Sequence, residues 1–188
     1  MCMSKIIAVS NRSLCTRPFL VQMERVCKAH PKAIILREKD LPEEEYALLA
    51  GPIMELCKQY EIPCILHTFL HTAKALSCPN IHLPLPLLRK YQNELFDFSV
   101  VGCSIHSVDE AIEAESLGAS YLTAGHIYAT DCKKGVPPRG LSFLSDVCTQ
   151  VSIPVYAIGG IKTDEEQLKE VCSCGAKGGC VMSGMMQL

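Results

Sequence analysis

Eight short apolar segments, separated by stretches of helical periodicity, constrain the fold of this chain more than any other feature. Several of them are rich in Val and Ile and apolar throughout, as is typical of parallel strands buried on both faces. Strand–helix alternation repeated eight times favours a closed (β/α)8 barrel, or TIM barrel, of the α/β class. The predicted strands cover residues 6–10, 33–39, 63–68, 80–84, 99–105, 119–127, 154–160 and 178–184.

An open, doubly wound sheet is the structural alternative. Such a sheet usually has fewer strands and a glycine-rich turn after the first one, whereas the turn here reads Asn11-Arg12-Ser13. Capping boxes mark the start of two predicted helices, Ser107 with Glu110 and Thr163 with Glu166. We therefore predict a single barrel domain over residues 1–188.

The end of the sequence leads to a prediction about assembly. The eighth strand is predicted to end near Gly184, and the four residues after it make only about one helical turn. We therefore predict a truncated or missing last helix, which would leave an apolar strand face uncovered. A homodimer that buries this face is expected, with Met185, Met186 and Leu188 near the contact. Neighbouring helices that lean over the gap are the alternative.

Composition argues against several classes of protein. The formal net charge of -2 is not that of a dedicated nucleic-acid binder. The apolar stretches are only strand-length, so no membrane association is expected, and the N-terminus does not resemble a secretion signal. The 12 cysteines form no C-x-x-C pair. Buried, reduced thiols in a cytoplasmic protein fit this pattern better than a zinc site or disulfides.

Polar residues at the C-terminal ends of the predicted strands are the candidate site, because active sites of such barrels lie there. Arg37 and Lys39 alternate with Glu38, so both cations are expected on one inward face, where they need an anionic partner. That partner is a ligand or, alternatively, Glu38 or a group on a neighbouring strand. Ser104 stands at the end of the fifth strand, within the same predicted ring of residues.

Two loops predict a phosphate site. Gly159-Gly160 ends the seventh strand, and adjacent glycines let backbone N–H groups approach a ligand closely. Ser183-Gly184 occupies the matching position after the eighth strand, so the two loops together are typical of a phosphate cradle. The alternative is that the glycines only permit a tight turn.

His126 is the candidate for proton transfer. It ends the sixth strand, a polar loop with Thr130 and Lys133 follows it, and an imidazole can accept and return a proton. A lone histidine is more often structural, and we interpret His30 and His82 in that way.

Six motifs, in order along the chain, resemble the thiamine phosphate synthase superfamily. They are L-R-E-K at 36–39, G-C-S-I-H-S at 102–107, A-G-H-I-Y-A-T at 124–130, K-K-G-V-P-P-R-G at 133–140, P-V-Y-A-I-G-G-I at 154–161 and V-M-S-G-M-M at 181–186. The resemblance implies a (β/α)8 barrel that binds a thiazole phosphate.

The superfamily has two main branches. The synthase joins a pyrimidine pyrophosphate to the thiazole phosphate and uses Mg2+ held by aspartates after the third and fourth strands. Here the third strand ends in His67-Thr68, and residues 82–88 carry no carboxylate. We therefore expect the other branch, a TenI-type thiazole tautomerase that aromatises a carboxythiazole phosphate by proton transfer in thiamine biosynthesis, with no metal or cofactor.

The resemblance also implies roles for particular residues. The catalytic residue would be His126. The phosphate would bind at Gly159, Gly160, Ser183 and Gly184. Further substrate contacts would be Arg37, Lys39, Ser104, Thr130 and Lys133. An active synthase and a non-catalytic thiazole-phosphate-binding regulator remain the alternatives.

Overall fold

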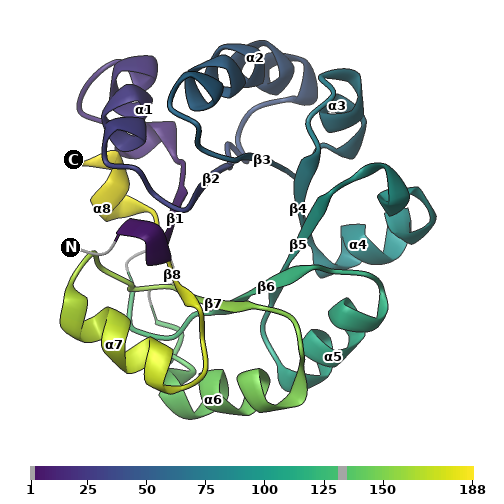
Figure 1. Cartoon of the computed structure of the whole chain (residues 1–188), viewed down its shortest axis with the longest axis vertical. Coiled ribbons are helices and arrows are strands. Elements are labelled where there is room, and N and C mark those ends of the chain that lie inside the picture. The colour runs from purple at the N-terminus through teal and green to yellow at the C-terminus, as the bar shows by residue number, and fades with distance from the viewer. Residues whose placement is uncertain (1–2, 131–134) are drawn as a thin grey trace.

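Eight parallel strands close into a barrel in the order β1 to β8 in the computed structural model, which describes residues 3–130 and 135–188. The ring is completed where β1 pairs with β8, with Ile6 opposite Gly179 and Ala8 opposite Val181. Figure 1 looks down the barrel and shows the helices outside the ring of strands. The predicted closed barrel is confirmed.

The predicted strands are all present. They are β1 (Ile6–Val9), β2 (Ala33–Leu36), β3 (Cys64–His67), β4 (Asn80–Pro84), β5 (Val100–Ile105), β6 (Tyr121–Gly125), β7 (Val155–Ile158) and β8 (Gly178–Val181). Most of them end earlier than predicted, because the polar residues at their C-terminal ends already belong to loops. Arg37 and Lys39, for example, follow β2 rather than extend it.

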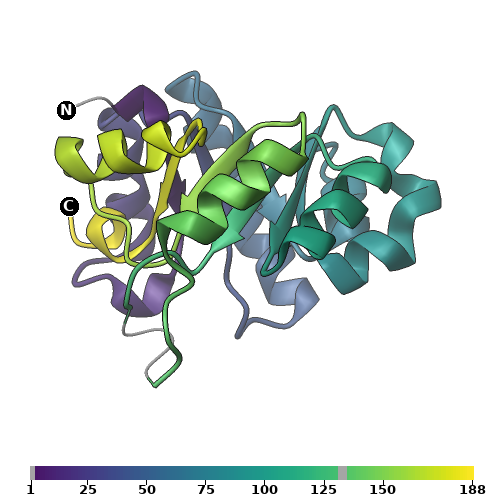
Figure 2. The same cartoon turned by 90° about the horizontal axis from the view of Figure 1, so that it is seen from below.

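Helices cover the outside of the barrel. They are α1 (Phe19–Lys28), α2 (Glu43–Gln59), α3 (Leu70–Ala75), α4 (Leu85–Tyr91), α5 (Val108–Ser116), α6 (Gly140–Gln150), α7 (Glu165–Ser173) and α8 (Ser183–Met186), with short 3-10 turns η1 (Met3–Lys5), η2 (Arg12–Leu14) and η3 (Gln92–Asp97). Figure 2, turned by 90°, shows that residues 135–139, which lead into α6, extend beyond the helices at one end of the barrel.

Side-chain caps begin two of the helices. Ser107 accepts a hydrogen bond from the Glu110 amide and caps α5, as predicted. The cap of α7 is Asp164, which accepts a bond of 2.8 Å from the Glu166 amide, so the prediction of Thr163 was wrong by one residue. Asp is a strong N-cap residue, and its carboxylate reaches the amide two positions on.

The apolar residues form two clusters because buried parallel strands present alternate side chains to opposite faces. The larger cluster fills the space between strands and helices. The smaller one fills the barrel and consists of Ile7, Val9, Ala33, Ile35, Ile65, Tyr121, Tyr156 and Cys180.

The C-terminal segment is packed inside the molecule. Met185 and Met186 are fully buried, and α8 lies beside α1 (Figure 1). The Gln22 side chain donates to the Met185 carbonyl at 2.7 Å, and Arg25 donates to the Leu188 carbonyl at 3.1 Å. Placing Met185 and Met186 at an intermolecular contact was therefore wrong, because neighbouring elements of the same chain cover them. The homodimer itself stays a prediction.

The cysteines of the described residues are free thiols, as predicted. Ten are described, and Cys2 and Cys132 lie outside the described residues. Within the same ranges, no helix is long and apolar enough to cross a membrane.

Candidate functional site

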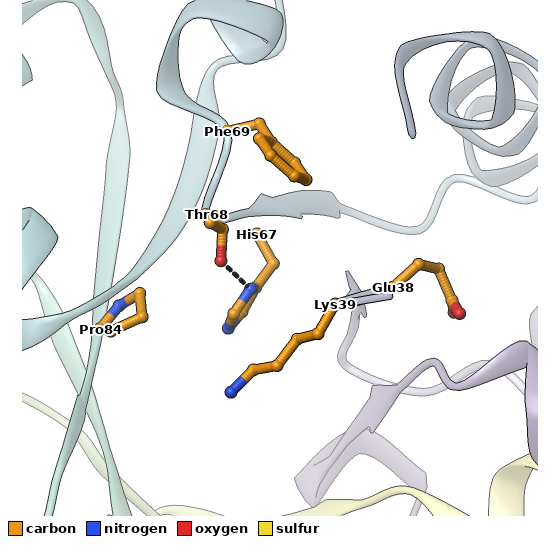
Figure 3. Close-up of a pocket in the computed structure, with 6 residues that line it drawn as sticks. All are labelled: Glu38, Lys39, His67, Thr68, Phe69 and Pro84. Carbon is orange, nitrogen blue, oxygen red and sulfur yellow. Dashed lines mark hydrogen bonds between the residues drawn. The ribbon is translucent and has the colours of Figure 1, made fainter. Parts of the chain in front are cut away.

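A cavity of about 270 Å³ opens at the C-terminal ends of β2, β3 and β4. Its lining comprises Glu38, Lys39, His67, Thr68, Phe69 and Pro84. Figure 3 shows the Lys39 side chain extending toward the His67 ring, whereas the Glu38 carboxylate points the other way. The cavity lies where active sites of this fold occur.

Glu38 is a buried carboxylate held by the loop that follows β1. Ser10 Oγ donates to Oε1 at 2.6 Å, and the Arg12 amide donates to both carboxylate oxygens, at 3.2 and 3.0 Å. The Arg12 guanidinium lies 3.7 Å from Oε2. Burial raises the pKa of Glu38. These contacts orient its carboxylate toward the β1 loop.

Two stacked histidines form the wall beside the cations. The rings of His67 and His82 lie 5.5 Å apart at an interplanar angle of 16°. Burial lowers the pKa of His82 to about 3, with a further contribution from Arg37. Burial also lowers the pKa of His67, helped by His82, Arg37 and Lys39. Both rings are therefore neutral at pH 7. Arg37 acts electrostatically on both rings, and Lys39 acts on His67.

Tyr46 and Thr68 fix the ends of β2 and β3. The buried Tyr46 hydroxyl donates to the Leu36 carbonyl at 2.7 Å and accepts from the His67 amide at 2.9 Å. Thr68 has a φ of 73°, which is unfavourable for a β-branched residue, and its hydroxyl lies 2.6 Å from His67 Nδ1. A strained residue held by its surroundings is a common feature of binding sites.

A chain of hydrogen bonds crosses the barrel interior from β6 to β5. Tyr121 Oη lies 2.8 Å from His82 Nδ1, and His82 Nε2 lies 2.8 Å from Ser104 Oγ. The Thr123 hydroxyl donates to Ser104 Oγ at 3.2 Å. The predicted residue Ser104 is therefore bonded to His82, whose ring stacks on that of His67 in the cavity wall.

His126 stands apart from this cavity, of which it is not a lining residue. Its ring is 4% exposed, with Nε2 at 3.3 Å from the Val136 carbonyl. Within the described parts of the chain, Nδ1 is the one buried side-chain nitrogen or oxygen without a hydrogen-bond partner. A buried polar atom of this kind is costly and suggests a functional or hydrated position.

The glycine pair after β7 packs on the segment after β6. Gly159 and Gly160 have φ values of 93° and 70°. A Cβ on Gly159 would lie 2.3 Å from His126 Cβ, and one on Gly160 would lie 2.6 Å from the Ala129 carbonyl oxygen. The glycines are thus required by this close packing, whether or not they also bind phosphate.

The other predicted residues are placed as follows. Ser183 and Gly184 begin α8, at the same end of the barrel as Gly159 because β7 and β8 are paired neighbours. Thr130 is partly buried after β6, and Lys133 lies outside the described residues. The phosphate role of the two loops remains a prediction.

Comparison with known proteins identifies the family. The profile of a family described as thiamine monophosphate synthase matches residues 6–185. The chain belongs to the thiamine monophosphate synthase family.

Curated relatives support this membership. The chain is 32% identical over 174 residues to thiamine-phosphate synthase 2 of Streptococcus pneumoniae serotype 4, covering 90% of this chain and 80% of that protein. It is 32% identical over 185 residues to thiamine-phosphate synthase of Syntrophomonas wolfei, covering 95% and 86%. It is 30% identical over 190 residues to thiamine-phosphate synthase of Clostridium novyi, covering 97% and 91%.

Solved structures of similar proteins share the barrel fold of this chain. Thiamine phosphate pyrophosphorylase from Pyrococcus furiosus superposes with a TM-score of 0.82 at 27% identity, covering 98% of this chain and 88% of that one. An N-acetylmannosamine-6-phosphate 2-epimerase from Clostridium perfringens, with a TM-score of 0.67 at 17% identity, covers 96% and 87% and shares the fold alone.

These relatives correct the sequence-based expectation of function. The similar family members are named thiamine-phosphate synthases, so the prediction of a TenI-type thiazole tautomerase was wrong. The prediction rested mainly on carboxylates missing after the third and fourth strands.

The structure nevertheless shows no carboxylate directly after β3 or β4, where the synthase resemblance places the magnesium-binding aspartates. The synthase resemblance implies Mg2+, which prefers hard oxygen ligands. The end of β3 presents His67 and Thr68, the end of β4 presents Pro84, and Glu38 is engaged by the β1 loop. No cluster of three or more His, Cys, Asp or Glu with metal-binding geometry occurs within residues 3–130 and 135–188. The described residues therefore do not fit a carboxylate-held magnesium ion.

Sequence reasoning missed three side chains that organise the site, namely Tyr46, His82 and Tyr121. His82 was assigned a purely structural role, although it lies on the same face of β4 as Pro84. Strand periodicity would have placed His82 and Tyr121 inside the barrel, but only the register between β4, β5 and β6 shows that they meet.

Proposed function

We propose that this protein joins a pyrimidine pyrophosphate to a thiazole phosphate to form thiamine phosphate. The observation that carries the proposal is the family match over residues 6–185, together with relatives named thiamine-phosphate synthase at 30–32% identity. The protein is accordingly a transferase in thiamine biosynthesis. A cytoplasmic location is part of the same proposal.

The pyrophosphate would bind beside Arg37 and Lys39. These cations follow β2, where both act electrostatically on the buried ring of His67 and Arg37 also acts on that of His82. Arg37 is partly buried, whereas Lys39 is exposed, so the anion would interact more strongly with Arg37, whose guanidinium can pair with two phosphoryl oxygens. The neutral rings add polar contacts without adding charge.

The thiazole phosphate would lie between Ser104 and the loops Gly159-Gly160 and Ser183-Gly184. Thr130, Lys133 and His126 are further candidate contacts at the end of β6. In the proposed reaction the ring nitrogen of the thiazole attacks the carbon that carries the pyrophosphate. The carbon–oxygen bond breaks, and the pyrophosphate leaves with the electron pair. Arg37 and Lys39 stabilise the charge that develops on this leaving group.

In the decisive experiment, the purified protein is incubated with the pyrimidine pyrophosphate and the thiazole phosphate, and the amounts of thiamine phosphate and released pyrophosphate are measured. We expect product with added Mg2+ and also in the presence of a chelator, because the described residues do not fit a carboxylate-held metal. Arg37→Gln should lower kcat/KM by about 100- to 1,000-fold, the usual effect of removing one preorganised charge donor.

The matched control is Arg89→Gln, which removes the same charge from an exposed ion pair with Glu113. Its kcat/KM should stay within about twofold of the unchanged protein, because exposed pairs contribute little. If thiamine phosphate formed neither with added Mg2+ nor with a chelator, the proposed function would be contradicted. Binding of thiazole phosphate without turnover would instead support a non-catalytic binder.

A further inference from the structure

A glycine lets two buried polar side chains meet across the intervening strand. His82 on β4 lies opposite Gly102 on β5, and Gly102 lies opposite Tyr121 on β6. A Cβ at Gly102 would lie 2.3 Å from Tyr121 Cζ and 2.4 Å from His82 Nδ1. The missing side chain is what allows the 2.8 Å contact between Tyr121 Oη and His82 Nδ1.

The direction of the hydrogen bonds follows from the groups involved. Burial raises the pKa of Tyr121 well above its ordinary value, so the phenol keeps its proton. That buried proton needs an acceptor, and His82 Nδ1 lies within reach. The His82 ring is neutral and carries only one proton, which must then be on Nε2. His82 Nε2 therefore donates to Ser104 Oγ at 2.8 Å.

Ser104 receives two hydrogen bonds in this arrangement. One comes from His82 Nε2, and the other comes from the Thr123 hydroxyl at 3.2 Å. A serine hydroxyl has two acceptor lone pairs and one proton, so the proton of Ser104 is directed away from both partners. Ser104 is partly exposed and lies at the C-terminal end of β5.

We propose that Tyr121 and His82 are positioning residues that preset the Ser104 hydroxyl as a hydrogen-bond donor to the bound ligand. The partner would be an atom with an available lone pair, such as a phosphoryl oxygen or an unprotonated ring nitrogen. The identity of the ligand in this inference rests on the proposed function. The orientation of the hydrogen bonds belongs to the ligand-free protein.

The first measurement is the tautomer of His82 by 15N NMR without ligand. We expect the Nε2-protonated form in the unchanged protein and a shift toward the Nδ1-protonated form in Tyr121→Phe, which loses the O–H donor. Tyr156→Phe is the matched control. It removes a hydroxyl from the ring that packs edge-on against Tyr121 at 6.0 Å but leaves the Tyr121–His82 bond intact. A native Nδ1-protonated ring would overturn the proposal.

The second measurement is a double-mutant cycle on binding, with thiazole phosphate and inorganic pyrophosphate as probes. Tyr121→Phe should weaken binding of one probe about tenfold, which corresponds to about 1.4 kcal/mol. In the Ser104→Ala background the same change should have no further effect, because it acts through the Ser104 hydroxyl.

The outcomes separate the two proposals. Additive losses in the cycle, or failure of both probes to bind, would overturn the role assigned to Tyr121 and His82. Coupled losses in binding without any formation of thiamine phosphate would leave that role supported and contradict the synthase reaction alone.

Discussion

The barrel interior has two unlike sides near its C-terminal end. One side, the polar arc, runs from β3 to β6 and comprises His67, His82, Ser104 and Thr123. The other side, the apolar arc, runs from β7 through β8 to β1 and comprises Val9, Tyr156, Ile158, Cys180 and Met182. The polar arc offers side-chain hydrogen bonds to a ligand, whereas above the apolar arc polar contacts would come from the loops Gly159-Gly160 and Ser183-Gly184.

The difference shows that, within one barrel, the apolar arc mainly stabilises the fold and the polar arc mainly provides groups for ligand recognition. Apolar side chains in a closed barrel stabilise it by burial alone and need no partners. Buried polar side chains are favourable only when each one is satisfied, and a satisfied network also fixes one orientation of its members. The polar arc should therefore be sensitive to pH and to small steric changes, and the apolar arc should be sensitive to any added polar atom.

The largest expected effect is acid destabilisation through the polar arc. Burial lowers the folded-state pKa of both His67 and His82 below the unfolded value of about 6.5. The unfolded state then binds more protons below that pH, so stability falls as pH falls. At pH 5 the loss is about 2 kcal/mol for His82 relative to pH 7, and His67 adds a loss of the same sign.

Urea unfolding at pH 7 and pH 5 measures this loss. His67→Gln should reduce this loss, whereas His71→Gln, at an exposed position, should leave it unchanged. If His67→Gln had the same pH dependence as the unchanged protein, the polar arc would not be the source of the effect.

The next largest effect is expected from Gly102→Ala. The new methyl group would clash with Tyr121 and His82, since the ideal Cβ lies only 2.3 and 2.4 Å from them. We expect a loss of about 1–3 kcal/mol, the usual cost of overpacking, measured by urea unfolding at pH 7. Gly51→Ala is the control, because its Cβ meets nothing within 4 Å apart from its chain neighbours. Pro52 follows it in α2 and disfavours helical geometry for a residue with a Cβ, so we expect no net gain from helix propensity and a smaller loss than for Gly102→Ala. Equal stabilities for the two variants would contradict the tight packing at Gly102.

The smallest effect tests the apolar arc. Cys180→Ser places a hydroxyl among apolar side chains, at a position that is 2% exposed. We expect Ser to be less stable than Ala at this position by about 1 kcal/mol, the low end of the cost of burying an unpaired hydroxyl. Thermal unfolding of Cys180→Ser and Cys180→Ala gives the difference directly. A serine variant as stable as the alanine variant would show that the arc tolerates polar atoms.

The strands could be predicted because each is an apolar run of the right length, and their number and alternation specified the closed barrel. The ends of the strands were harder to predict from the sequence. Arg37 and Lys39 were predicted to lie in the second strand, because no local sequence pattern distinguishes a charged strand end from the first residues of a loop. The burial of Met185 and Met186 depended on Gln22 and Arg25, about 160 residues away, which no local pattern reveals.

The candidate site could be predicted only in part. Position at strand ends led to Lys39, which lines the cavity, and to Ser104, which belongs to the polar network, but their contacts with substrate stay predictions. The roles of His82 and Tyr121 depend on strand register and on the empty space above Gly102, and both are properties of the assembled barrel. Reaction type was the weakest inference, because it was drawn from absent carboxylates rather than from groups that are present.

The pairing of β1 with β8 has a consequence for biosynthesis. Ile6 and its partner Gly179 lie about 170 residues apart in the sequence, so Gly179 is synthesised long after Ile6. At about 5–20 residues per second, the first strand waits roughly 10–35 seconds on the ribosome before its second neighbour exists. During that interval its open edge and its apolar neighbours are available to other chains. We expect the nascent protein to depend on chaperones until β8 and α8 have emerged.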